Sequence, residues 1–196
     1  MSQKFSALIT AAGYSQRMGN HKALLKYNDT QSFLERIIEC YFQINCDEIV
    51  ITASTALNEK IINLQNGRVK IVENQYPELE RIYSIKIGLQ ALTNFDFCFI
   101  HAVDNPFVKT ETLLKLSENK EKEQIIAPYF QNKGGHPILI NKKIINLLIN
   151  NTDYQLKLNQ FLSNYPKLKI ETEDENILIN INTEAEYKEV FRSVNY

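Results

Sequence analysis

The distribution of hydrophobic and polar residues along the chain predicts a regular alternation of strands and helices. Short apolar runs, typical of buried strands, occupy residues 5–10, 48–53, 68–73, 95–103 and 124–130. Between these runs, apolar residues recur with helical periodicity over 32–44, 58–65, 83–93 and 110–120. Because buried strands that alternate with helices form parallel sheets, the pattern predicts an α/β fold with a mostly parallel central sheet and helices on both faces.

The alternation becomes less regular in the last third of the chain. A turn and a strand are predicted within 134–140, and helical periodicity returns over 142–150 and 154–165. Residues 168–181 predict one or two further strands, and 183–194 predict a closing helix that begins with a capping box at Thr183 and Glu186. No linker and no internal repeat divides the sequence, so residues 1–196 are expected to form a single domain.

Composition argues against several classes of protein. The 196 residues include 22 basic and 23 acidic side chains, a formal net charge of −1, so we expect neither nucleic acid nor a membrane as partner. No segment has the roughly 20 apolar residues that span a bilayer, and the N-terminus lacks the apolar core of a signal peptide. Cys40, Cys46 and Cys98 form no CxxC motif and are interpreted as structural, a reactive thiol being the weaker alternative. A cytoplasmic protein is expected.

Three segments of unusual composition are expected to lie together. In open parallel sheets, ligands bind beyond the carboxyl ends of the strands. The segments at 11–22 and 104–107 each follow a predicted strand, and a Gly-Gly turn occupies 134–137. We therefore expect all three to border one ligand site.

The first of these segments combines small residues with two cations. Ala11, Ala12 and Gly13 allow backbone N–H groups to approach an anion, and Arg17 and Lys22 supply positive charge. The spacing fits neither the Rossmann fingerprint nor the P-loop. Residue types alone therefore leave two interpretations open: a phosphate-binding loop, or a surface turn whose cations point into water.

Asp104 ends the most apolar strand and is followed two residues later by proline. A rigidly held carboxylate at such a position suits Mg²⁺, which binds through one or two carboxylates together with substrate phosphates. The alternative is that Asp104 caps the helix predicted to begin near Lys109. His101, on the same face of the strand as Phe99 and Val103, is interpreted as a half-buried, hydrogen-bonded histidine.

The stretch LITAAGYSQRMGNHKALLKY, residues 8–27, resembles the L-x-A-A-G-x-S-x-R-M-G-x-x-K-x-L-L signature of MobA-like nucleotidyltransferases. This family includes molybdenum cofactor cytidylyltransferases and guanylyltransferases. The resemblance implies a three-layer Rossmann-like fold and a nucleoside triphosphate bound by this loop. The small residues at 11–13 would lie along the base and ribose, and the triphosphate would face Ser15, Arg17 and Lys22.

Other segments resemble the same family less closely. FIHAVDNPFV resembles its Asp-x-Pro element, which implies that Asp104 coordinates Mg²⁺. NKGGHPILI is similar to an element that borders the acceptor pocket in the cytidylyltransferase branch. His136 would then face the acceptor's phosphate, or, in the alternative interpretation, would only fix the turn.

The segment ERIYSIKIGLQAL aligns with a family helix that helps to hold the nucleotide, and Ser84 is its matching serine. Arg81, Ile82 and Tyr83 stand where the family usually has small residues. In ILININTEAEY, Asn180 and Asn182 replace two family aspartates; Asn-x-Asn-Thr also occurs in the guanylyltransferase branch.

The resemblance implies transfer of a nucleotidyl group, with release of pyrophosphate, by a site that contains Arg17, Lys22 and Asp104. CTP is the leading donor and GTP the alternative. Molybdopterin is the leading acceptor, with a sugar phosphate as the alternative, and a molybdoenzyme or a chaperone would be the protein partner. A nucleotide-binding regulatory protein without turnover is the non-enzymatic alternative.

Overall fold

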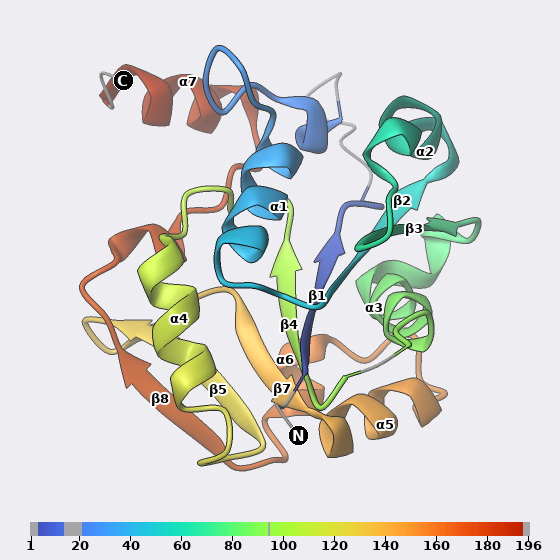
Figure 1. Cartoon of the computed structure of the whole chain (residues 1–196), viewed down its shortest axis with the longest axis vertical. Helices are drawn as coiled ribbons and strands as arrows, with labels where there is room; N and C mark the ends of the chain where they lie inside the picture. The colour runs from blue at the N-terminus through green and yellow to red at the C-terminus, as the bar shows by residue number, and fades with distance from the viewer. Residues whose placement is uncertain (1–3, 14–20, 94, 194–196) are drawn as a thin grey trace.

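The computed structural model describes residues 4–13, 21–93 and 95–193, and its strands form one eight-stranded sheet. The strand order is β3-β2-β1-β4-β7-β5-β6, with β8 paired to β5 (Figure 1). The strands are β1 (Phe5–Thr10), β2 (Glu48–Ser54), β3 (Val69–Asn74), β4 (Phe97–Ala102), β5 (Ile125–Phe130), β6 (Lys133–Gly134), β7 (Ile138–Asn141) and β8 (Lys167–Glu171).

Most of the sheet is parallel, as the alternating pattern predicts. Strands β3, β2, β1 and β4 are all parallel neighbours, and β8 is parallel to β5. Strand β7 is antiparallel to both β4 and β5, and the short β6 is antiparallel to β5. The antiparallel strands lie beyond β4, where the sequence pattern also loses its regularity.

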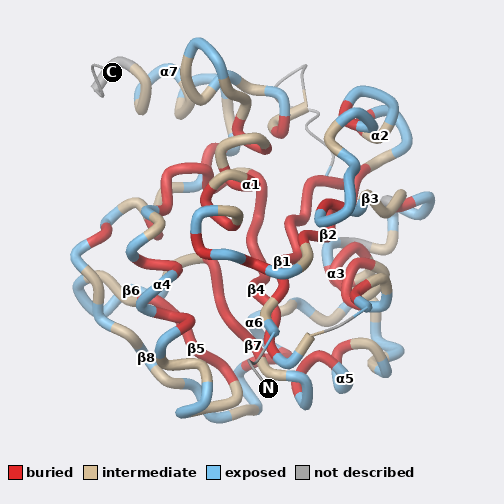
Figure 2. The backbone as a smooth tube through the Cα atoms, in the orientation of Figure 1, coloured by how far each residue is buried: buried red, intermediate tan, exposed pale blue. Residues whose placement is uncertain are grey.

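Helices cover both faces of the sheet, which gives the three layers implied by the family resemblance. The buried side chains of α1 (Phe33–Gln43), α2 (Thr55–Ile61) and α4 (Thr110–Glu118) share one apolar core with Ala7 and Ile9 of β1. Those of α3 (Glu80–Gln90), α5 (Lys142–Asn150) and α6 (Leu158–Leu162) form a second core with Leu8. Successive residues of a strand point to opposite faces, so β1 contributes to both cores. Figure 2 shows β1 and β4 as buried strands at the centre of the molecule.

A third, smaller cluster attaches α7 (Glu184–Ser193) to the rest of the protein. Phe33, Phe107 and Ile181 are its buried members, and Tyr187 and Phe191 of α7 pack against them. Figure 1 shows α7 beside the segment that leads into α1. The predicted capping box of α7 is confirmed, because Thr183 and Glu186 exchange backbone-to-side-chain hydrogen bonds of 2.9 and 3.2 Å.

In the last third of the chain one predicted helix is shorter than expected, and one of the one or two predicted strands is present. The helix expected over 154–165 is limited to α6, at Leu158–Leu162. Of residues 168–181, only the first part is a strand, β8, and Glu175–Leu178 forms a short 3-10 helix. Beyond β8, the Asp174 carboxylate accepts the backbone N–H of Lys109 at 2.9 Å, which ties this segment to the start of α4.

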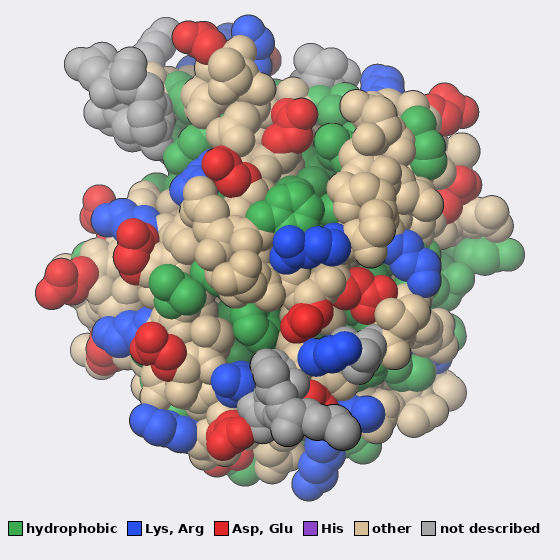
Figure 3. Space-filling model, in the orientation of Figure 1, with side chains coloured by type: hydrophobic (Ala, Val, Ile, Leu, Met, Phe, Trp, Pro, Cys, Tyr) green, Lys and Arg blue, Asp and Glu red, His purple; other side chains and the backbone are tan. Residues whose placement is uncertain are grey.

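The three cysteines are free and buried, which confirms their structural interpretation. Burial raises the pKa of the Cys46 thiol to about 12, so it is not a reactive thiolate near neutral pH. No helix in the described part of the chain is long and apolar enough to cross a membrane. Acidic and basic side chains are interspersed over the face seen in Figure 3.

Candidate active site

Lys22 and Asp104 meet beyond the carboxyl ends of the two central strands. β1 and β4 are adjacent, with Thr10 opposite Ala102 in the register. Lys22 follows the loop after β1, and its Nζ lies 3.8 Å from Oδ2 of Asp104, which follows β4. The same Nζ donates a hydrogen bond of 2.8 Å to Oδ1 of Asn182. Residues 160 positions apart in the chain are thus joined at this edge of the sheet.

The second carboxylate oxygen of Asp104 is buried and unpartnered among the described residues. This atom, Oδ1, has no hydrogen-bond donor. The alternative role of Asp104 as a helix cap is wrong, because the N–H of Lys109 at the start of α4 is bound by Asp174 instead. Burial of a carboxylate oxygen without a hydrogen-bond donor raises the free energy of the folded protein. Such an oxygen is a suitable ligand for a cation.

A buried hydrogen-bond chain supports the loop that carries Asp104. His101 is only 1% exposed, more buried than its pattern predicts. Its Nδ1 lies 3.0 Å from the Tyr41 hydroxyl, and its Nε2 lies 2.8 Å from the carbonyl oxygen of Asn105. A carbonyl only accepts, so Nε2 carries the proton and Nδ1 accepts from Tyr41. Burial lowers the pKa of His101 to about 4, which keeps the ring neutral.

Of the small residues after β1, Ala11 and Ala12 are buried, and Gly13 lies in open space among the described residues. A Cβ added to Gly13 would meet no heavy atom within 4 Å. The N–H of Ala11 donates to the carbonyl oxygen of Thr52 at 2.8 Å, so this group completes the sheet and is not available to a ligand. Ser15 and Arg17 of the predicted triphosphate loop lie outside the described residues.

Ser84, predicted to help hold the nucleotide, is buried at the end of β3. It is 5% exposed, and its hydroxyl accepts a hydrogen bond of 2.8 Å from the side chain of Asn74. Its contact therefore joins α3 to the end of β3. Ser84 thus helps to hold α3 against the sheet.

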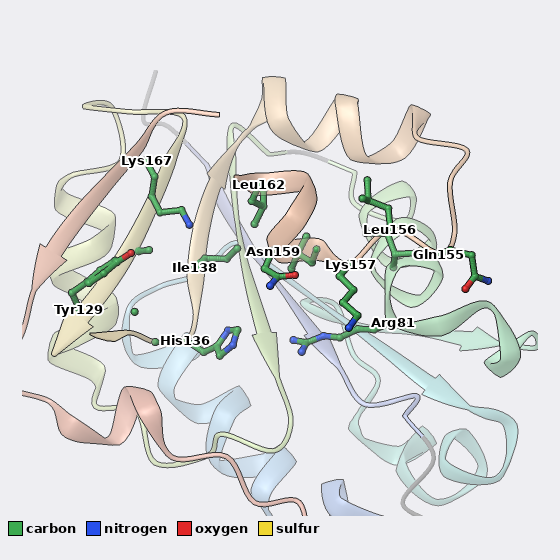
Figure 4. Close-up of a pocket in the computed structure, with 15 residues that line it drawn as sticks. Arg81, Tyr129, His136, Ile138, Gln155, Leu156, Lys157, Asn159, Leu162 and Lys167 are labelled. Atoms are coloured by element: carbon green, nitrogen blue, oxygen red, sulfur yellow. The ribbon is translucent and has the colours of Figure 1, made fainter. Parts of the chain in front are cut away.

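A cavity of about 590 Å³ has His136 and Arg81 on its wall (Figure 4), and the charge of Asp104 acts on both of these side chains. His136 belongs to the predicted Gly-Gly turn and precedes a cis proline. Gly135 is required there, since an added Cβ would lie 2.5 Å from the backbone oxygen of Ile177. Asp104 thus pairs with Lys22 of the first segment, and its charge acts on His136 of the Gly-Gly turn. Arg81, which sequence reasoning noted only as a departure from the family, joins them.

Electrostatic effects link Arg81, Asp104 and His136. Burial lowers the pKa of Arg81, although the side chain reaches solvent through the cavity, and the Asp104 carboxylate opposes that change. Burial, and then the positive charge of Arg81, lowers the pKa of His136. His136 is therefore neutral near pH 7, and its Nδ1 is buried without a partner among the described residues.

This fold and this strand-end site are typical of enzymes that bind a nucleotide at the edge of an open α/β sheet. The match to known families is more specific: residues 7–168 match the MobA-like NTP transferase domain. The chain belongs to the MobA-like NTP transferase family and is a nucleotidyltransferase, as its opening signature predicts.

Curated relatives and solved structures agree with this assignment. The chain is 30% identical over 201 residues to a probable molybdenum cofactor guanylyltransferase of Clostridium perfringens (strain SM101 / Type A), covering 96% of this chain and 97% of the relative. It is 25% identical over 183 residues to the molybdenum cofactor cytidylyltransferase of Escherichia coli (strain K12), covering 92% of each. Rv0371C of Mycobacterium tuberculosis H37Rv, solved in complex with manganese, has a similar fold, with a TM-score of 0.81 at 16% identity over 98% of this chain and 100% of that one.

Proposed function

We propose that this enzyme transfers GMP from GTP to a phosphorylated acceptor, molybdopterin, and releases pyrophosphate. The observation that carries the proposal is the meeting of Lys22 and Asp104 at the carboxyl ends of adjacent central strands, 3.8 Å apart. A lysine and a carboxylate at this place can hold a triphosphate and its metal ion from opposite sides.

The choice of GTP departs from the expectation of CTP. The comparisons do not confirm CTP, and several relatives that the chain matches are probable guanylyltransferases. The Asn-x-Asn-Thr sequence that ends in Thr183 supports the same choice. CTP stays the second candidate, because a cytidylyltransferase is also among the relatives and the Gly-Gly-His-Pro element is similar to that branch.

Asp104 fits a divalent cation. Its buried Oδ1 has no hydrogen-bond partner in the described part of the chain, and its donor atoms are oxygens, as Mg²⁺ prefers. Among the described residues no cluster of three or more His, Cys, Asp or Glu side chains forms a complete metal cage. This agrees with an ion that takes its other ligands from substrate phosphates and water. When bound, Mg²⁺ would neutralise charge on those phosphates.

The chain's own residues would act by placing and neutralising charge. An oxygen of the acceptor's phosphate attacks the α-phosphorus, a new P–O bond forms, and the bond to the bridging oxygen of pyrophosphate breaks. The attacking phosphate is ionised near neutral pH, so no general base is needed. Lys22, together with Arg17 of the same loop, would neutralise the triphosphate in the transition state, while Asn182 holds the Lys22 ammonium in place. His136 would border the acceptor.

Two measurements test this proposal. A thermal-shift series with Mg²⁺ and each ribonucleoside triphosphate should show stabilisation by GTP, since a ligand that binds only the folded state raises the melting temperature. Pyrophosphate release with GTP and molybdopterin should then fall by about 100-fold or more in Lys22→Ala. Lys26→Ala, a change of an exposed lysine of the same segment, is the matched control and should retain activity. Stabilisation by CTP alone would reject the choice of donor, and near-normal release by Lys22→Ala would reject the site.

A further inference from the structure

We propose that Arg81 and Lys157 together bind the phosphate dianion of the acceptor, and that they select a phosphate monoester with an apolar, ring-bearing body. The inference rests on the proposed function and concerns the cavity that has Arg81 and His136 on its wall. The proposal assigns phosphate binding to Arg81, a residue that the family resemblance does not explain.

The charged side chains on the cavity wall are all positive. Fifteen residues line it, among them the cations Arg81, Lys157 and Lys167, and none is an aspartate or a glutamate. Within the described part of the chain, no carboxylate forms an ion pair with any of these three side chains. Like charges that face one cavity raise the free energy of the empty protein, and an anion in the cavity would remove that cost.

Arg81 lies where an attacking phosphate has to be held. The charge of Arg81 acts on both Asp104 and His136, so Arg81 lies near the proposed metal carboxylate and near the acceptor turn. In Figure 4 the ends of Arg81 and Lys157 point toward the part of the cavity that His136 borders. Lys157 comes from the segment just before α6, far from Arg81 in sequence. Two cations from separate segments can therefore contact one phosphate.

The rest of the wall indicates the body of the acceptor. Ile138, Leu156 and Leu162 supply apolar surface, and the Tyr129 ring supplies an aromatic one. The buried Nδ1 of His136 offers one hydrogen bond to a polar atom on that body. A cavity of about 590 Å³ is large enough for a ring system with a short phosphorylated arm.

Binding of phenyl phosphate tests the inference without requiring the natural acceptor. Isothermal titration at pH 7.5 would compare the unaltered protein with Arg81→Met and Lys157→Met; methionine keeps much of the side chain and removes the charge. We expect about tenfold weaker binding for Arg81→Met and about fivefold weaker binding for Lys157→Met. Lys143→Met, a change of an exposed lysine of α5 outside the cavity, is the matched control and should bind as the unaltered protein does.

Two further arms locate the anion and define its charge. Phenyl sulfate, a monoanion of the same shape, should bind at least fivefold more weakly than phenyl phosphate. Lys22→Ala should change the affinity for phenyl phosphate by less than twofold, since Lys22 does not line the cavity. Three results would each overturn the inference. The first is equal affinity for phenyl phosphate in Arg81→Met, Lys157→Met and the unaltered protein. The second is no binding at 10 mM, roughly the weakest affinity that a useful site would have, and the third is loss of binding in Lys22→Ala alone.

Failure of this inference is distinguishable from failure of the proposed function. If GTP binds and is turned over, but the affinity for phenyl phosphate does not depend on Arg81, the inference is wrong and the proposed function stands. If no nucleotide stabilises the protein but phenyl phosphate binds in an Arg81-dependent way, the anion site stands and the proposed function falls. In a transfer assay, Arg81→Met should raise the KM for the acceptor about tenfold and leave the thermal shift by GTP unchanged.

Discussion

Acidification tests the buried hydrogen-bond chain that runs from Tyr41 through His101 to the backbone of Asn105. The neutral His101 ring donates from Nε2 to the Asn105 carbonyl and accepts at Nδ1 from the Tyr41 hydroxyl. Protonation would place a second proton on Nδ1 and a charge in an environment without water. Since the loop after His101 carries Asp104, the stability of this chain also bears on the active site.

The size of the effect follows from the difference in pKa between the two states. His101 has a pKa of about 4 in the folded protein and an ordinary value of 6.5 in the unfolded chain. The folded-state value is the lower one, so the stabilisation is complete above pH 6.5 and is lost as the pH falls toward 4. At about 1.4 kcal/mol per pH unit, lowering the pH from 7.5 to 4.5 should remove about 2.5 kcal/mol of the free energy of unfolding through this residue.

Urea unfolding of the unaltered protein and of His101→Gln at several pH values isolates this contribution. Other groups also titrate in acid, but they are common to both proteins and cancel in the difference. His101→Gln should be less stable at pH 7.5, because a buried contact is altered, and should lose about 2.5 kcal/mol less on acidification. Parallel pH profiles for the two proteins would refute the reasoning.

Three further predictions concern packing and the site. Gly88→Ala should lower the free energy of unfolding by about 2 kcal/mol in urea titrations, because the added Cβ would lie 2.3 Å from Cδ1 of the buried Leu8; an unchanged midpoint would contradict this packing. Asn182→Ala should lower kcat about fivefold with little change in melting temperature, since it removes the 2.8 Å hydrogen bond that holds Lys22; an unaltered kcat would exclude that positioning role. Asp104→Asn should raise the Mg²⁺ concentration for half-maximal pyrophosphate release at least tenfold, and an identical Mg²⁺ dependence would remove Asp104 from the metal site.

Much of the fold could be predicted from local patterns. The apolar runs at 5–10 and 95–103 predict the two central strands, because strands buried on both faces need continuous hydrophobic sequence. The capping box of α7 was also predictable, since its two residues are three positions apart and interact locally. The helix expected at 154–165 was too long, because periodicity does not show where tertiary contacts end a helix.

The sequence by itself determined the family and the class of reaction, because the opening signature is a set of residue types at fixed local spacing. Only the tertiary structure decided which distant residues meet. It brought Asn182 to Lys22 across 160 positions, paired the buried Ser84 with Asn74, and added Arg81 to the wall of the cavity. These contacts depend on the packing of helices and loops that are distant in the chain. Rules based on residue spacing do not predict them, because such rules apply only where local backbone geometry fixes the separation of the residues.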